Sequence, residues 1–139
     1  MILDEATANK IVESINFKKM NGLIPVVVQD ITDNRVLMVA FADKEAVIKS
    51  LTKGFTHFYS RSRKKIWMKG DTSGHTQKII EVYLDCDNDT ILFKVEQNIA
   101  ACHTGFRSCF YRKMNEKGEW FIAETRIFEP SKVYGKVEE

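Results

Sequence analysis

Apolar residues at helical spacing predict two amphipathic helices in the N-terminal part of the chain, at residues 5–16 and 43–54. The second begins after a candidate N-cap aspartate and ends at Gly54, a residue that commonly terminates helices. Between them, the β-branched runs at residues 23–30 and 35–41 are separated by turn residues. This pattern predicts a β-hairpin between the two helices.

From Phe55 onward the pattern changes to short strands. The strand-like segments are residues 55–60, 66–69, 77–87, 91–97, 106–114 and 119–128. Turn residues such as Asp87–Asp89 and Asn115–Gly118 separate them. We therefore expect one α+β domain over residues 1–139, with a mostly antiparallel sheet or pseudo-barrel that carries two helices. The polar tail, residues 129–139, is expected to be loosely ordered.

Composition agrees with a single globular domain, since 44% of the residues are hydrophobic and 29% are charged. The net charge is only +2, so any attraction for phosphate must come from local clusters of cations. The sequence shows neither a secretory leader pattern nor an apolar run of the ~18 residues that a membrane span requires. We expect a cytoplasmic protein without a membrane partner.

Cys86, Cys102 and Cys109 are an odd number of cysteines in a chain without an export signal, which argues against a disulfide framework. They are either buried filler residues or thiolate ligands that share one zinc ion. Three cysteines would leave one zinc position open for water, as catalytic sites require. His103 could close the site as a fourth ligand, carry protons beside it, or be a structural side chain.

An acidic cluster surrounds Cys86 in the segment EVYLDCDND. If this segment is a strand, its alternation places Asp85, Asp87 and Asp89 on one face and Cys86 on the other. Carboxylate oxygens suit magnesium, so the cluster is a candidate magnesium site. An ordinary solvated acidic turn is the alternative interpretation.

Residues 60–65 contain four cations and two hydroxyl groups, and they are followed by Trp67, Lys69, Gly70 and Ser73. Hydroxyls, glycines and arginine side chains are the groups with which proteins bind phosphate. A solvated basic loop and an RNA-binding patch are the alternatives. Trp67 could stack on a base or fill the core.

Three segments, SRSRKKIWMKGDTSGHTQ, DCDND and ACHTGFRSCF, together resemble the phosphoribosyl-AMP cyclohydrolases, and the similarity runs from about residue 23 to residue 114. The resemblance implies a hydrolase that opens the adenine ring of phosphoribosyl-AMP between nitrogen 1 and carbon 6. The product would be the aminoimidazole carboxamide intermediate of histidine biosynthesis.

The resemblance also implies two metals and an intertwined homodimer. The cysteines matching Cys86, Cys102 and Cys109 bind zinc across the dimer interface, so that each chain accounts for one zinc ion. The aspartates matching Asp85, Asp87 and Asp89 bind magnesium. One departure is Ile99, where the family usually has glycine, so the turn before Cys102 could differ in shape.

By the same likeness, a nucleotide substrate would be bound by residues of the basic segment and the loop after it. These residues are Ser60, Arg61, Ser62, Arg63, Trp67, Lys69, Gly70 and Ser73. A histidine would carry the proton to the departing ring nitrogen. His103 is the first candidate for this role, with His57 and His75 as the others.

Two other functions compete with this interpretation. One is a structural zinc protein that binds RNA through residues 60–69, but the near-neutral net charge argues against a nucleic-acid partner. The other is a zinc-dependent nucleoside deaminase. That class pairs His-x-Glu with Pro-Cys-x-x-Cys, and neither motif occurs in the chain.

Overall fold

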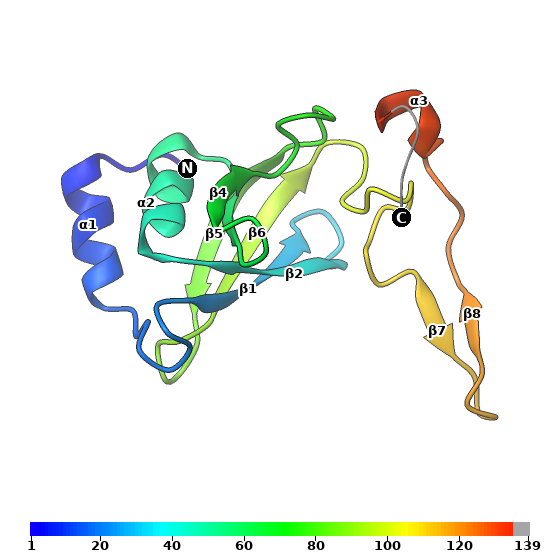
Figure 1. Cartoon of the computed structure of the whole chain (residues 1–139), viewed down its shortest axis with the longest axis horizontal. Coiled ribbons are helices and arrows are strands. Elements are labelled where there is room, and N and C mark those ends of the chain that lie inside the picture. Colours follow the sequence, from blue (N-terminus) through cyan, green and yellow to red (C-terminus); the bar gives the residue numbers. More distant parts are fainter. Residues whose placement is uncertain (135–139) are drawn as a thin grey trace.

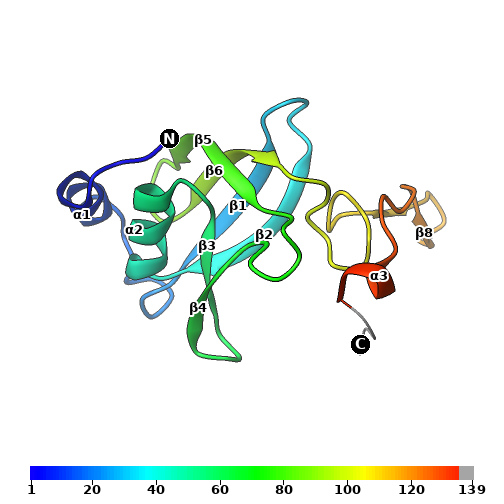
Figure 2. The same ribbon diagram turned by 90° about the horizontal axis from the view of Figure 1, so that it is seen from above.

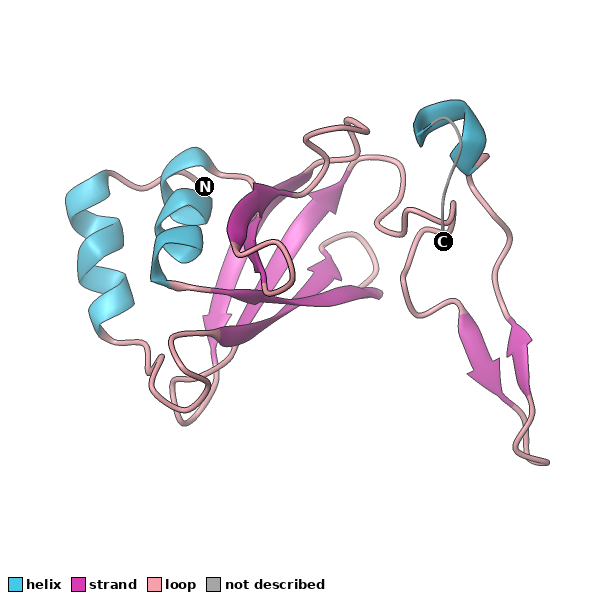
Figure 3. Cartoon of the chain, in the orientation of Figure 1, coloured by secondary structure: helices cyan, strands magenta, loops and turns pink. Residues whose placement is uncertain are grey.

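The computed structural model describes residues 1–134. It contains three helices, α1 (Glu5–Glu13), α2 (Lys44–Lys53) and α3 (Pro130–Tyr134) (Figures 1 and 3). The strands are β1 (Ile24–Asp30), β2 (Val36–Ala42), β3 (His57–Ser60), β4 (Lys65–Met68), β5 (Gln77–Leu84), β6 (Ile91–Gln97), β7 (Arg112–Met114) and β8 (Trp120–Ile122). The predicted α+β class is confirmed.

The predicted elements of the N-terminal part are present with slightly different bounds. The side chain of Asp43 caps α2 by accepting a hydrogen bond of 2.8 Å from the backbone N–H of Ala46. Gly54 ends the helix in the left-handed conformation, with φ of 81°. Strands β1 and β2 form the predicted antiparallel hairpin.

The main sheet has four strands in the order β2-β1-β6-β5. All its neighbours are antiparallel except β1 and β6, which run parallel. Alternate residues of these two central strands are buried, among them Val26, Val28 and Phe93. They pack with buried residues of α1 and α2, such as Val12 and Val47, to form the hydrophobic core.

Several expectations about the architecture are corrected. No closed barrel forms in the described part of the chain, because β2 and β5 end the sheet at opposite edges and do not pair. Residues 1–134 form three helices and not two, since the start of the tail folds as α3. The rest of the tail, residues 135–139, lies outside the described residues.

Three predicted strands are shorter than expected. The strand predicted at residues 77–87 ends at Leu84, where the chain turns. The segments 106–114 and 119–128 form only the short antiparallel pair β7 and β8. This small hairpin projects away from the main sheet (Figures 1 and 2). Its strand residues are exposed, so no core fixes longer strands there.

None of the helices within residues 1–134 is long and apolar enough to cross a membrane.

Candidate active site and metal-binding residues

A cavity of about 550 Å³ opens between β2, the β3–β4 hairpin and the loop after β4. It is lined by Ala40, Phe41, Tyr59, Ser60, Ser62, Arg63, Trp67, Lys69, Gly70, Asp71, Thr72, Ser73, His103 and Tyr134. All the sequence-predicted substrate residues are in this lining except Arg61. The guanidinium group of Arg61 instead lies 4.1 Å from the centre of the Phe41 ring.

The β3–β4 hairpin positions the basic segment at the cavity. Phe58 pairs with Trp67, and Ser60 with Lys65, so the three cations between Ser60 and Lys65 fall in the connecting turn. The hydroxyl of Ser60 accepts a hydrogen bond of 3.2 Å from the backbone N–H of Arg63, which closes this turn. Hydroxyl groups and a guanidinium group therefore face one cavity, as anion recognition requires.

The backbone conformation and close packing at residue 70 require glycine. The φ of Gly70 is 84°, and a Cβ atom there would lie 2.5 Å from backbone atoms of His75 and Thr76. The loop that carries Gly70 and Ser73 can therefore fold back on itself only with glycine at this position. Half-buried Gln97 supports the same loop by donating a hydrogen bond of 3.2 Å to the carbonyl of His75.

Lys69 extends from the cavity toward the cysteine pair. Its amine lies 5.9 Å from the centre of the Trp67 ring. Burial lowers the pKa of Lys69, while the nearby thiols of Cys109 and Cys102 act in the opposite direction. A half-buried cation thus lies at the cavity wall and near these two thiols.

The three histidines lie in different surroundings, and of them only His103 lines the cavity. His57 is buried, its Nδ1 lies 2.8 Å from the carbonyl oxygen of Phe55, and burial lowers its pKa. His75 is also buried and packs edge-on against Phe128. Geometry therefore favours His103 as the group that could exchange a proton with a bound molecule.

Cys102 and Cys109 lie together in an irregular loop. The sequence placed Cys109 on a strand, but residues 101–110 form turns that bring the two thiols into contact. The Cys109 thiol donates a hydrogen bond that lowers the pKa of Cys102 to about 5, and this bond raises the pKa of Cys109. The loop is joined to the main sheet by the backbone N–H of Cys109, which donates to the carbonyl of Leu37 at 2.8 Å.

Cys86 lies elsewhere. It is exposed in the turn between β5 and β6, at the opposite end of the main sheet from residues 101–110 (Figures 1 and 2). Within the described residues, no cluster of potential metal ligands contains Cys86 together with Cys102 and Cys109. A single described chain therefore brings two of the three cysteines together.

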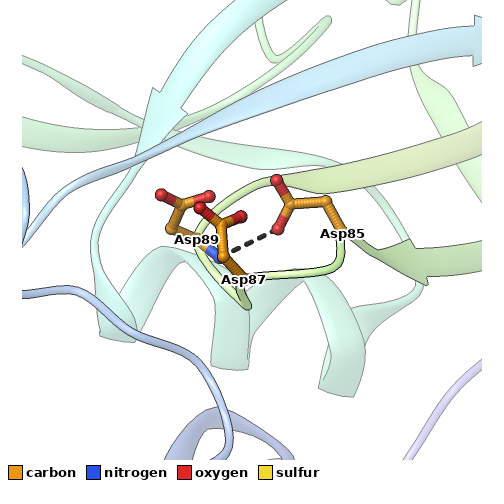
Figure 4. Close-up of side chains that lie close together, drawn as sticks. All are labelled: Asp85, Asp87 and Asp89. Atoms are coloured by element: carbon orange, nitrogen blue, oxygen red, sulfur yellow. Dashed lines mark hydrogen bonds between the residues drawn. The ribbon is translucent and has the colours of Figure 1, made fainter.

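The three aspartates do converge. Oxygen atoms of Asp85, Asp87 and Asp89 lie within 4.8 Å of one another (Figure 4). A turn produces this arrangement, and the predicted strand alternation is wrong, because β5 ends at Leu84. Asp85 accepts a backbone hydrogen bond of 3.0 Å from Asp89, which closes the turn. Three carboxylates at this spacing suit a divalent cation.

A lysine far away in sequence contacts this acidic turn. The amine of Lys19 lies 2.8 Å from Asp87 and 2.9 Å from Asp89. The hydrogen bond from Lys19 lowers the pKa of Asp87 to about 2. Nothing in the local pattern around Lys19 indicated this contact, which joins residues 68 positions apart.

Sequence reasoning also missed part of the cavity lining. Phe41 and Tyr59 lie on segments that were predicted as strands but not as part of a site. Tyr134 lies in the tail that was expected to be loosely ordered. The position of Tyr59 next to Ser60 was a usable signal. For Tyr134 the sequence contains none, because α3 reaches the cavity through tertiary packing.

Known proteins are similar to this chain over the segments that form the cavity and the cysteine loop. A family model described as phosphoribosyl-AMP cyclohydrolase matches residues 38–111, which include the cysteine loop and every residue of the cavity lining except Tyr134. A protein of that name from Pelobacter propionicus is 53% identical over 123 residues, covering 88% of this chain and 98% of the relative. Another, from Geobacter sulfurreducens, is 52% identical over 124 residues, with the same coverage.

A third relative shows the same likeness. The phosphoribosyl-AMP cyclohydrolase of Methanospirillum hungatei is 50% identical over 117 residues, which cover 84% of this chain and 86% of the relative. Identity at this level over most of both chains extends well beyond a shared motif. The chain belongs to the phosphoribosyl-AMP cyclohydrolase family.

Proposed function

We propose that this protein hydrolyses the adenine ring of phosphoribosyl-AMP, as a step of histidine biosynthesis, with zinc and magnesium as cofactors. The names of its relatives support the reaction. The observation that carries the proposal is the single cavity in which Arg63, Lys69 and the hydroxyls of the basic segment meet His103. A nucleotide phosphate would bind to the cations, and the ring would lie toward His103 and Trp67.

Zinc would be held by Cys102 and Cys109, together with Cys86. Their donor chemistry fits zinc. The two thiols are in contact and the pKa of Cys102 is lowered to about 5, so the pair supplies soft sulfur ligands with a negative charge. A zinc ion with an open position makes water acidic enough to act as a nucleophile near neutral pH. His103, on the cavity wall, would transfer the proton to the departing ring nitrogen.

The third thiolate would come from a second copy of the chain. Cys86 is exposed and lies at the other end of the main sheet from Cys102 and Cys109, so it cannot join them without leaving its turn. In a two-fold dimer, Cys86 of each chain can reach the loop of its partner. The protein would then be an intertwined homodimer with two shared zinc sites.

The test of this arrangement is complementation between two inactive variants, Cys86→Ser and Cys102→Ser. Ring opening is followed by ultraviolet absorbance, and zinc by elemental analysis. After the two variants are unfolded and refolded together, about half of the dimers are mixed and each has one intact site, so about a quarter of wild-type activity should return. Mixtures that stay inactive despite verified heterodimers would overturn the shared site.

Magnesium would be held by Asp85, Asp87 and Asp89, whose carboxylate oxygens lie close together in the turn after β5. Carboxylate oxygens are hard ligands that suit magnesium, whereas the soft thiolates of the cysteine site suit zinc. Removing magnesium while elemental analysis shows zinc retained should abolish turnover, and adding magnesium should restore it. Full activity in magnesium-free buffer would leave the cluster as a solvated turn.

A further inference from the structure

We infer that an apolar contact between chains accompanies the shared thiolate site. In it, Leu84 and Tyr83 of one copy pack against Phe110 and Trp120 of the other. This inference rests on the proposed function, because it assumes that Cys86 meets Cys102 and Cys109 across two chains. It adds an interaction surface and names the second copy of this chain as its partner.

One half of the contact lies beside Cys109. A cavity of about 390 Å³ is lined by Cys109, Phe110, Arg112 and Trp120. The side chain of Trp120 is 69% exposed, and Phe110 is also exposed. These residues belong to the loop and to the projecting β7–β8 hairpin (Figure 2). Two large aromatic residues held open to solvent beside a cavity are typical of an unoccupied protein interface.

The other half lies beside Cys86. Tyr83 and Leu84 end β5, which is an edge strand of the main sheet, and Leu84 is 39% exposed. The hydroxyl of Tyr83 donates a hydrogen bond of 2.6 Å to Glu81. Large apolar side chains are therefore exposed to solvent at the end of β5, and Leu84 is only two residues before Cys86.

Chain connectivity brings these two halves together. Sulfur ligands of one tetrahedral zinc ion lie about 4 Å apart. Leu84 is two residues from Cys86, and Phe110 is adjacent to Cys109, so each is within about 8 Å of its ligand along the backbone. A dimer that forms the shared site therefore brings these two exposed apolar surfaces into the same region of the interface.

Charge supports the same pairing. The turn that carries Cys86 contains three aspartates, whereas the strand after Cys109 begins with the exposed cations Arg112 and Lys113. Opposite charges would therefore face each other around the apolar contact and set its orientation. Two-fold symmetry would form the contact twice in each dimer.

The experiment uses two charge variants of the full-length protein, Leu84→Lys and Trp120→Glu, with dimer dissociation measured by sedimentation. Each variant alone should dimerise at least about tenfold more weakly, because every contact then buries an unpaired charge. Mixing the two should restore much of the affinity. In the mixed dimer, one contact keeps its native residues and the other pairs the introduced lysine with the introduced glutamate.

The matched control is Ile11→Lys on α1, where the native side chain is 42% exposed, close to the value for Leu84. It should dimerise like the wild type. If either interface variant does not refold, Tyr83→Lys replaces Leu84→Lys and Phe110→Glu replaces Trp120→Glu in the same mixing experiment.

The outcome separates this contact from the proposed function. If the cysteine variants complement each other but the charge variants dimerise as tightly as the wild type, the contact is wrong and the shared site stands. Weakened variants that gain nothing on mixing also overturn the contact. If the cysteine variants fail to complement, the assumption behind the contact fails with the proposed site.

Discussion

The Nζ atom of Lys19 lies 2.8 Å from Oδ2 of Asp87. The same amine contacts Asp89 at 2.9 Å, so a cation of the protein offsets part of the negative charge of the candidate magnesium turn. About half of each side chain in the Lys19–Asp87 pair is exposed to solvent, and exposed ion pairs contribute little to stability. A divalent cation can therefore displace Lys19, which makes this lysine a competitor for the site.

Replacing Lys19 by methionine should tighten magnesium binding by about twofold to fivefold, because the ion no longer displaces an ion pair worth up to ~1 kcal/mol. Isothermal titration with magnesium measures the change. Lys18→Met is the control, since it removes a neighbouring positive charge that, within the described residues, forms no ion pair with these aspartates. Weaker binding in the Lys19 variant would show that the lysine attracts the ion instead of competing with it.

Arg63 and Arg61 allow a matched comparison within one turn. Arg63 lines the cavity, so Arg63→Ala should raise the KM about tenfold to a hundredfold while leaving the Tm almost unchanged. Arg61 lies over Phe41, and its removal should lower the unfolding free energy by about 0.5–1 kcal/mol. We expect Arg61→Ala to raise the KM less than Arg63→Ala. Steady-state kinetics and thermal melts of both variants decide, and equal KM values would mean that Arg61 also reaches the substrate.

His103→Asn should lower kcat by about a hundredfold or more without reducing substrate affinity, because the cavity would lose its proton carrier. His57→Gln should keep kcat and lose stability, because its buried ring contacts a backbone carbonyl. Comparing kcat with the unfolding free energy of each variant distinguishes the roles. A His57 variant that folds normally and is inactive would assign the proton transfer elsewhere.

Ile99 is strained. Its φ of 64° lies in the left-handed region, which costs a β-branched residue about 1–2 kcal/mol. The turn before Cys102 thus keeps a conformation that suits glycine. Ile99→Gly should raise the unfolding free energy by about 1 kcal/mol, measured by urea denaturation. Asn21→Gly, at a φ of 54°, is the control and should change little, because asparagine tolerates this region.

The Arg107 side chain stabilises the fold in a pH-dependent way. Its hydrogen bond to Asp33 lowers the pKa of that carboxyl from its ordinary value of 3.8 to about 2. A lowered folded-state pKa contributes stability that is present above the unfolded pKa and is lost as the pH falls through the folded one.

Arg107→Ala should therefore be less stable than the wild type at pH 6, and the difference should shrink between about pH 4 and pH 2. Urea denaturation at a series of pH values measures it. Lys113→Ala, which removes an exposed cation of the hairpin, serves as the control. A difference that stays constant down to pH 2 would assign the effect to lost packing of Arg107.

Local features of this protein were predictable from sequence for a physical reason. The helix faces, the caps at Asp43 and Gly54 and the β1–β2 hairpin depend on residues within a few positions of each other. The basic side of the cavity is predictable in the same way, because residues 60–73 form one hairpin and one loop. The acidic cluster was predicted correctly as a group but from the wrong geometry, since a turn and not a strand brings it together.

Sequence by itself determined the family, the α+β class, the local elements and the chemical character of each segment. Only the tertiary structure decided which distant segments meet. It paired β1 with β6 in parallel, brought Lys19 to Asp87, selected His103 among three histidines and separated Cys86 from Cys102 and Cys109. The reason is that sequence periodicity indicates whether a side chain is buried. Which residues that side chain contacts depends on how the whole chain packs.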